Sequence, residues 1–276
     1  MASAGGELMR RQCLFCLLVF AILIGPNLHA QVSSSERVQV APPLVRRAEP
    51  PAAKATVEDL EQRGDELRAE KAYLDALDYY RAALAKKSSP QIYNKAGITE
   101  LLLQRFRESR RDFERAIKSD REYADAYNNL GVVYYEERKY RKAIKQYQRA
   151  IELRADAASY YSNLGAAYFS RKEFEKAALA YNEALHLDPD VLERTSRAGV
   201  TAQLPSPEDR AHYHYVMAKL YAKMGATDRC LEHLRRALEE GYKGIGDVYK
   251  DAEFAELRKD PRFTELMATR PLAIPE

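Results

Sequence analysis

The 276-residue chain has no tryptophan, only three cysteines and a net charge of just +3 at pH 7. The low net charge argues against nucleic acid as the main partner. Cys13 and Cys16 lie in an apolar segment near the start of the chain, so its removal would leave Cys230 alone and allow no internal disulfide. We therefore predict that Cys230 is a packing residue. In place of tryptophan, 19 tyrosines supply aromatic bulk.

Motifs that carry chemistry are also missing. No nucleophile elbow and no glycine-rich phosphate loop occurs, and the acidic residues are scattered over polar faces. His212 and His214 are two residues apart, which places them on different faces of a helix, whereas a metal-binding pair on a helix is spaced by four. We predict a non-enzymatic protein without a metal site or a cofactor.

A sequence unit of 34 residues recurs along the chain. The two clearest copies are AYNNLGVVYYEERKYRKAIKQYQRAIEL (126–153) and YYSNLGAAYFSRKEFEKAALAYNEALHLDP (160–189), in which Gly131 and Gly165 correspond. The period extends back to Gly97 and Gly64. A further copy, shifted by an insertion, contains Ala218, Tyr221, Gly225, Cys230, Leu234 and Ala237. A fixed period of this length is typical of stacked supersecondary units.

Each unit contains two apolar stretches of helical periodicity, which predicts a pair of amphipathic helices. Small residues recur at the eighth position of the unit, usually glycine, and at the twentieth. The residues at the twentieth position are Ala76, Ser109, Ala143, Ala177 and Cys230. Both positions suit a close helix crossing, where added methylenes would cost roughly 1–3 kcal/mol.

At these residues the chain resembles the tetratricopeptide repeat (TPR) family, of an exported bacterial type. The family pattern W-x2-L-G-x2-Y appears with Tyr127 and Tyr161 in place of tryptophan. The flanking copies depart from it, for example with Ala218 in place of glycine. The resemblance implies an all-α, right-handed α-solenoid of about five helix-turn-helix units over 57–242. The expected repeats are 57–89, 90–123, 124–157, 158–191 and 211–242, with an insertion at 192–210.

The two ends differ from the repeats. Residues 1–30 have a basic start, an apolar run and a small residue at the end, which predicts a signal peptide and export to the periplasm or beyond. An uncleaved membrane anchor is the alternative. Residues 31–56 are rich in Pro, Ser and Ala and predict a flexible linker. Residues 243–276 contain short amphipathic pieces, which predict a helical cap for the last repeat.

The insertion has its own helix signals. Asp190 can cap a short helix through 191–198 that stops at Gly199, and Ser206 followed by Pro207 predicts a new helix start. The segment between is either a tolerated surface insertion or a binding loop.

In the family that the chain resembles, the first helices of successive repeats line a concave surface that holds peptides. The corresponding residues here are Asn94, Lys95, Asn128, Asn129, Val132, Tyr135, Asn163, Phe169 and Tyr215. We expect the amides of Asn129 and Asn163 to match a peptide backbone. Tyr135, Phe169 and Tyr215 are expected to supply apolar anchors. An inert surface is the alternative, because Asn before Leu-Gly is common in the family.

One function of the family is not expected. Its cochaperones grip carboxylate tails with Lys, Arg and Asn side chains. The corresponding positions here are Glu61, Asp65, Lys95, Asp125 and Asn129. Three acids would face the anionic tail, so we predict that this chain is not such a carboxylate clamp.

Two basic stripes occupy the second helices of repeats 2 and 3. They consist of Arg107, Arg111 and Arg115, and of Arg141, Lys145 and Arg149, each spaced by four. We call these six residues the basic patch. It is either a solvated convex face or a surface for an anionic partner such as lipid headgroups.

The sequence thus predicts a protein-interaction scaffold of the bacterial cell envelope that binds a protein or peptide in its concave groove. The alternative is a membrane-tethered assembly factor that uses the convex basic patch, with membrane contact through it or through residues 1–30.

Overall fold

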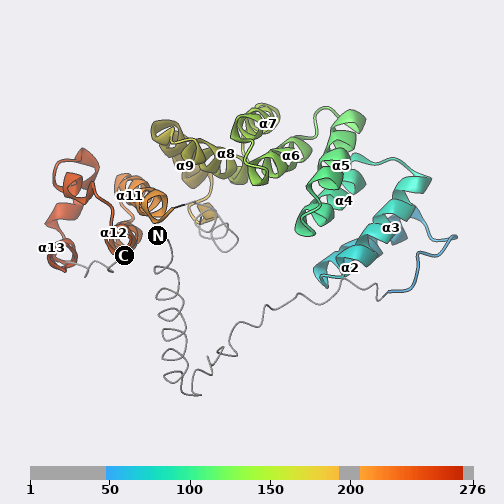
Figure 1. Ribbon diagram of the computed structural model, residues 1–276, viewed down its shortest axis with the longest axis horizontal. Helices are drawn as coiled ribbons and strands as arrows, with labels where there is room; N and C mark the ends of the chain where they lie inside the picture. Colours follow the sequence, from blue (N-terminus) through green and yellow to red (C-terminus); the bar gives the residue numbers. More distant parts are fainter. Residues whose placement is uncertain (1–47, 193–205, 270–276) are drawn as a thin grey trace, which may run out of the picture. The chain divides into compact units, whose positions relative to one another are not determined.

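A computed structural model describes residues 48–192 and 206–269, and these residues form helices and turns without strands (Figure 1). The α-helices are α2 (Val57–Ala69), α3 (Tyr73–Lys86), α4 (Pro90–Leu102), α5 (Phe106–Ser119), α6 (Ala124–Glu136), α7 (Tyr140–Leu153), α8 (Ala158–Ser170), α9 (Phe174–Leu187), α11 (Pro207–Lys223), α12 (Thr227–Glu239) and α13 (Pro261–Ala268). Short 3₁₀ helices η1 (Ile245–Tyr249), η2 (Ala252–Phe254) and η3 (Leu257–Lys259) precede α13. The predicted all-α class is confirmed.

The helices pack as consecutive hairpins. The hairpins are α2–α3, α4–α5, α6–α7, α8–α9 and α11–α12, and each second helix also packs on the first helix of the next hairpin. The first helices α4, α6 and α8 additionally pack on one another in chain order. This is the packing of a helical solenoid, in which each unit buries its apolar faces against its neighbours. None of the described helices combines the length and the hydropathy that crossing a membrane needs.

The turn within each hairpin has one residue in the left-handed region. Lys71, Gln104, Arg138 and Lys172 have φ between 57° and 62°, and Gly225 has φ 72° in the fifth hairpin. This residue and the next one donate their backbone N–H groups to carbonyls in the last turn of the first helix, as in a Schellman motif. In the third hairpin, for example, Arg138 donates to the Tyr135 carbonyl and Lys139 donates to the Tyr134 carbonyl. One turn geometry therefore recurs although the residue types differ.

The hairpins close around the predicted glycines. A Cβ built on Gly131 would lie 2.5 Å from the Tyr147 ring, and one on Gly64 would lie 2.6 Å from the Tyr80 ring. Gly97 and Gly165 face the rings of Phe113 and Tyr181 in the same way. Cys230 is fully buried and unpaired, as predicted for a packing residue, and burial raises the pKa of its thiol to about 12.

Several helix starts are capped by side chains. Thr56 and Asp59 form a capping box at α2, and Ser89 caps α4. Ser206 caps α11, which begins at Pro207 as the sequence predicts. The first helix of the fifth hairpin thus begins four residues before residue 211, the predicted start of that repeat.

The described end of the predicted linker packs on the first hairpin. The Ala48 N–H donates to Asp75 Oδ1 at 3.0 Å, and the Tyr79 hydroxyl donates to the Glu49 carbonyl at 3.1 Å. Lys86 Nζ reaches the Ala53 carbonyl at 2.8 Å. Residues 48–56 therefore differ from the expectation of a flexible linker, because α3 presents polar groups that bind their backbone.

The segment after α12, for which the sequence predicts a cap, packs on the last hairpin. Val248, Phe254, Leu257 and Phe263 are buried in the same cluster as residues of α11 and α12. Arg258 donates to the carbonyls of Val248 and Asp251, each at 2.9 Å, which ties the short helices together. The predicted signal segment, most of the 192–210 insertion with its expected helix, and the last seven residues lie outside the described residues.

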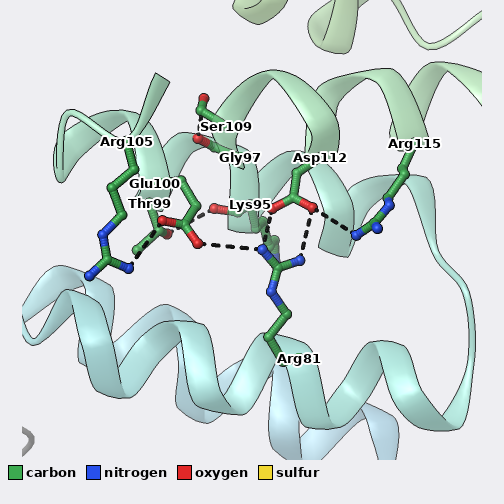
Figure 2. A network of polar contacts seen from close by, with 9 residues as sticks. All are labelled: Arg81, Lys95, Gly97, Thr99, Glu100, Arg105, Ser109, Asp112 and Arg115. Atoms are coloured by element: carbon green, nitrogen blue, oxygen red, sulfur yellow. Dashed lines mark hydrogen bonds and ion pairs between the residues drawn. The ribbon is translucent and has the colours of Figure 1, made fainter. Parts of the chain in front are cut away.

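A polar cluster joins the first two hairpins (Figure 2). Arg81 of α3 forms two hydrogen bonds to the Asp112 carboxylate of α5, at 2.8 and 2.5 Å, and lies 3.4 Å from Glu100 Oε1 of α4. Two further arginines complete the cluster: Arg105 lies 3.4 Å from Glu100, and Arg115 lies 3.5 Å from Asp112. Glu100 and Asp112 are buried, and burial raises the pKa of Glu100 against the opposing charges of Arg105 and Arg81. We call these five side chains the junction cluster.

Candidate binding face

Four asparagines form a continuous row across the first helices α4, α6 and α8. Asn163 Nδ2 donates to Asn128 Oδ1 at 2.9 Å, Asn128 Nδ2 donates to Asn129 Oδ1 at 3.2 Å, and Asn129 Nδ2 donates to Asn94 Oδ1 at 2.9 Å. Asn94 Nδ2 continues the row to the Tyr123 hydroxyl at 3.4 Å. We call Asn94, Asn128, Asn129 and Asn163 the amide row.

The amide row follows from the repeat. Asn94 and Asn128 occupy one position of the unit in repeats 2 and 3, and Asn129 and Asn163 occupy the next position in repeats 3 and 4. Asn94 and Asn128 are buried, whereas Asn129 and Asn163 are partly exposed. The sequence predicted that these residues belong to one face, and the structure brings them together. It did not predict that they would bond to one another.

Lys95 is held by two carboxylates of α2. Its Nζ lies 2.5 Å from Glu61 Oε1 and 2.5 Å from Asp65 Oδ2, and the Tyr80 hydroxyl donates to Asp65 at 2.7 Å. Burial lowers the pKa of Lys95, but the hydrogen bonds to Asp65 and Glu61 outweigh it, so the pKa lies above its usual value. Lys95 is therefore already neutralised by the first hairpin.

The third acid of this face, Asp125, is paired as well. Its carboxylate accepts hydrogen bonds from Arg154, which follows α7, and from the Tyr160 hydroxyl at 2.5 Å. The Arg154 guanidinium also lies 5.0 Å from the centre of the Tyr160 ring. The acids at the clamp positions thus each have a partner within the chain, and the exclusion of a carboxylate clamp stays a prediction.

The three aromatic anchors have to be corrected. Tyr135 and Phe169 are buried because the aromatic residue that opens the following helix packs on each, with ring centres 5.4 Å apart for Tyr135 and Tyr140. Tyr215 is buried under the cap, where it stacks on Tyr242 at 4.5 Å. Buried rings cannot supply anchor area to a ligand. Of the predicted apolar residues, Val132 remains partly exposed.

The basic patch is exposed along α5 and α7. Arg115 pairs with Asp112 and Arg149 pairs with Glu152 at 2.9 Å. The other four side chains form no ion pair with any described residue: Arg107, Arg111, Arg141 and Lys145. α5 packs on α4 and α6, and α7 packs on α6 and α8, so each stripe lies on the free side of its helix.

Within residues 48–192 and 206–269, no group of His, Cys, Asp and Glu has the geometry of a metal site. His214 and His233 instead face each other across α11 and α12, with their Nδ1 atoms 3.0 Å apart. Burial lowers the pKa of His214 to about 4 and that of His233 to about 3. Both therefore carry no charge at neutral pH.

The fold and the amide row together define the class of protein. It is an all-helical repeat protein in which helical hairpins stack and the first helices present a row of polar side chains. Three family models match it, as tetratricopeptide repeat over 94–140 and 158–191 and as TPR repeat over 133–170. Residues 94–191 of the chain therefore consist of tetratricopeptide repeats.

The chain is also similar to several solved structures. MamA (residues 41 to the end) from Desulfovibrio magneticus RS-1 is 18% identical, with 68% of this chain and 97% of that chain covered and a TM-score of 0.49. A thermophilic TPR protein of Thermus thermophilus is 19% identical, with 77% and 100% covered and a TM-score of 0.47. YrrB, described as a TPR protein with an unusual peptide-binding site, is 20% identical, with 72% and 98% covered and a TM-score of 0.46. No curated protein sequence matches the chain significantly.

Proposed function

We propose that this protein is a non-enzymatic interaction scaffold that binds an extended protein segment along the amide row. The observation that carries the proposal is the partial exposure of Asn129 and Asn163 within a row that is bonded internally. Each of these amides donates only one of its two N–H hydrogens to the row. The second N–H remains for a ligand, and a peptide backbone offers the matching carbonyl groups.

The surroundings of the row suit an uncharged segment. Ile98 and Val132 lie one turn further along α4 and α6 and are partly exposed, so they add apolar contact area beside the amides. Lys95 is neutralised by Glu61 and Asp65 at one end of the row. The hydrogen bonds within the row also fix the amide side chains before a ligand arrives, which reduces the entropy lost on binding.

We further propose that the protein acts in the cell envelope, on the strength of the signal-like residues 1–30. N-terminal sequencing of the mature protein tests export, since cleavage after Ala30 would give a chain that begins at Gln31.

The groove proposal is tested by affinity capture from envelope extracts. Wild type is compared with Asn129→Ala/Asn163→Ala and with the control Gln148→Ala/Asn182→Ala, which removes two amides from the second helices α7 and α9. The proposal expects partners that the wild type and the control recover and that the first variant loses. Circular dichroism checks that all variants remain helical. Equal recovery of every partner by the three proteins would contradict binding at the row.

The alternative function is a membrane-tethered assembly factor that contacts an anionic surface through the basic patch. It is supported by the four exposed cations that form no ion pair with described residues, Arg107, Arg111, Arg141 and Lys145. Three results together would favour this alternative: partner capture is unaffected by loss of the amides, it is abolished by Arg111→Glu/Lys145→Glu, and it weakens steeply with salt.

A further inference from the structure

A second charged site lies where the third and fourth hairpins meet. A pocket of about 360 Å³ is lined by the turn between α6 and α7, by the first residues of α7 and by the residue that follows α8. Its lining residues are Arg138, Lys139, Tyr140, Arg141, Lys142 and Arg171. We call it the cationic pocket. It shares only Arg141 with the basic patch and contains no residue of the amide row.

The positive charge of the cationic pocket is only partly neutralised within the described chain. Lys139 pairs with Glu137 at 2.9 Å, but Glu137 is shared with a further cation outside the pocket, at 3.4 Å. Arg171 pairs with Glu173 at 2.8 Å, and Glu173 is shared with Lys176, also at 2.8 Å. The carboxylates of Glu137 and Glu173 thus each pair with one cation of the pocket and with one cation outside it.

Three cations of the pocket form no direct ion pair with a described carboxylate. Arg138 and Arg141 have none within contact distance, although the charge of Arg141 acts on Glu173 together with those of Arg171 and Lys176. Lys142 lies over the Tyr134 ring, 5.6 Å from its centre. The exposed Glu136 precedes the turn and engages another group of the chain. Unpaired cations so close together repel one another, and a bound anion would remove that cost.

Packing does not require this charge pattern. The first turns of the other second helices each carry an acid, namely Asp75 in α3, Glu108 in α5, Glu175 in α9 and Asp228 in α12. The first turn of α7 carries none and has Arg141 and Lys142 instead. Hairpins with an acid in this turn form the same helix pairs, so packing does not account for the basic residues of α7.

We propose that the cationic pocket binds a phosphate-bearing ligand. Arginine forks match the geometry of phosphate oxygens and bind them through paired hydrogen bonds. Several uncompensated positive charges suit a phosphate of multiple negative charge better than one carboxylate. The ligand is either a soluble phosphate compound or the headgroup of a phosphorylated lipid. The site is independent of the amide row, so a partner bound on the row and a phosphate in the pocket can be held together.

The test uses the full chain and two charge-matched variants. The pocket variant is Arg138→Gln/Arg141→Gln/Lys142→Gln; glutamine suits position 138 because Gln104 adopts the same left-handed conformation in the second hairpin. The control variant is Lys87→Gln/Lys118→Gln/Arg121→Gln, which removes three exposed cations that belong neither to the cationic pocket nor to the basic patch. Titration calorimetry measures binding of inorganic tripolyphosphate, and co-sedimentation measures binding to phosphatidylcholine vesicles with and without phosphatidic acid.

Saturable binding of tripolyphosphate is expected for wild type and control. The pocket variant should bind at least about 100-fold more weakly, because a charge-assisted hydrogen bond contributes about tenfold or more in affinity. Binding to phosphatidic acid vesicles alone, lost in the pocket variant, would support the pocket and assign the ligand to lipid. Equal weakening in the two variants, or no binding of either probe by wild type, would overturn the proposal. Unchanged thermal unfolding shows that the variants remain folded.

Discussion

Each of the first four hairpins places one glycine against an aromatic ring sixteen residues later in the chain. Gly131 approaches Tyr147 so closely that no Cβ fits between them, and the other early hairpins repeat this contact. The fifth hairpin has Ala218 and Leu234 at the same spacing, both fully buried. An added methyl is tolerated there because leucine has no ring to meet it. The residue at the glycine position and the residue sixteen positions later therefore change together between repeats.

We predict that Gly131→Ala destabilises the protein, although alanine favours a helix by about 1 kcal/mol over glycine. The Cβ would lie 2.5 Å from the buried Tyr147 ring, and overpacking of this kind costs roughly 1–3 kcal/mol. In the double variant Gly131→Ala/Tyr147→Leu the clash is absent. Urea unfolding should therefore show that the double variant loses less stability than Gly131→Ala and Tyr147→Leu lose in sum. Gly246→Ala is the control, since nothing lies within 4 Å of its added Cβ. Strictly additive effects would contradict the clash.

The repeat predicts most of the helix pairing, because a 34-residue period fixes which residues face the neighbouring helix. It does not predict the junction cluster, whose members are 31 and 19 residues apart in the chain. One signal was available: Glu100 occupies the position that holds Tyr134 and Tyr168 in the next two repeats. An acid at a position otherwise aromatic indicates a buried charge that needs a partner.

The junction cluster should respond strongly to loss of its central cation. Arg81→Met leaves Asp112, which is 1% exposed, and Glu100 without their shared partner. We expect a loss of roughly 3 kcal/mol in the free energy of unfolding, because the buried Asp112 carboxylate then keeps only its longer contact with Arg115. Arg63→Met is the matched control: its pair with Glu66 is exposed and screened by solvent, so its loss should change the stability far less. Urea unfolding compares the two, and equal losses would show that the cluster adds nothing beyond a surface pair.

For the binding face, the sequence predicted the position of the amides but misjudged the aromatic residues. Tyr135 and Phe169 lie near the ends of their first helices, where Tyr140 and Phe174 fold back over them after the turn. Helical periodicity within one element could not reveal this cover, because it comes from the next element. Tyr215 is covered by residues from a still later segment, the cap.

Along the described residues, apolar burial is divided into successive clusters, and one cluster joins repeat 4, the fifth hairpin and the cap. In such a linear stack each unit is stabilised by its immediate neighbours. The terminal part contains the His214–His233 pair between α11 and α12. The charged groups that act on the pair are Arg210, Arg229 and Arg236, with Glu240 at 3.9 Å from His214 Nε2.

We predict that acid destabilises the protein through this histidine pair. Burial is the main cause that lowers the pKa of both rings below the value of about 6.5 in the unfolded chain. Arg236 and Arg210 add to it for His214, and the charge of His214, followed by those of Arg236 and Arg229, adds to it for His233. Protonation therefore favours unfolding, so the contribution of the pair is complete above pH 6.5 and is lost as the pH falls toward 4. Each ring contributes up to roughly 1.4 kcal/mol per pH unit in that window.

Thermal unfolding between pH 7.5 and about 4.5 measures this dependence. His214→Asn/His233→Asn should flatten the decrease in melting temperature, whereas His186→Asn, which changes an exposed ring, should leave it as in wild type. An identical pH profile in all three proteins would show that the acid sensitivity arises elsewhere.

The amide row has a consequence for the orientation of whatever it binds. Every amide passes its hydrogen bond the same way, from Asn163 through Asn128 and Asn129 to Asn94 and on to Tyr123. The side-chain carbonyl oxygen of Asn163 accepts no hydrogen bond from the other residues of the row, so the series begins at Asn163. A polypeptide is itself a directional chain of donors and acceptors, so one running with the row and one running against it would meet different atoms. The scaffold would then recognise the direction in which a guest strand runs as well as its sequence.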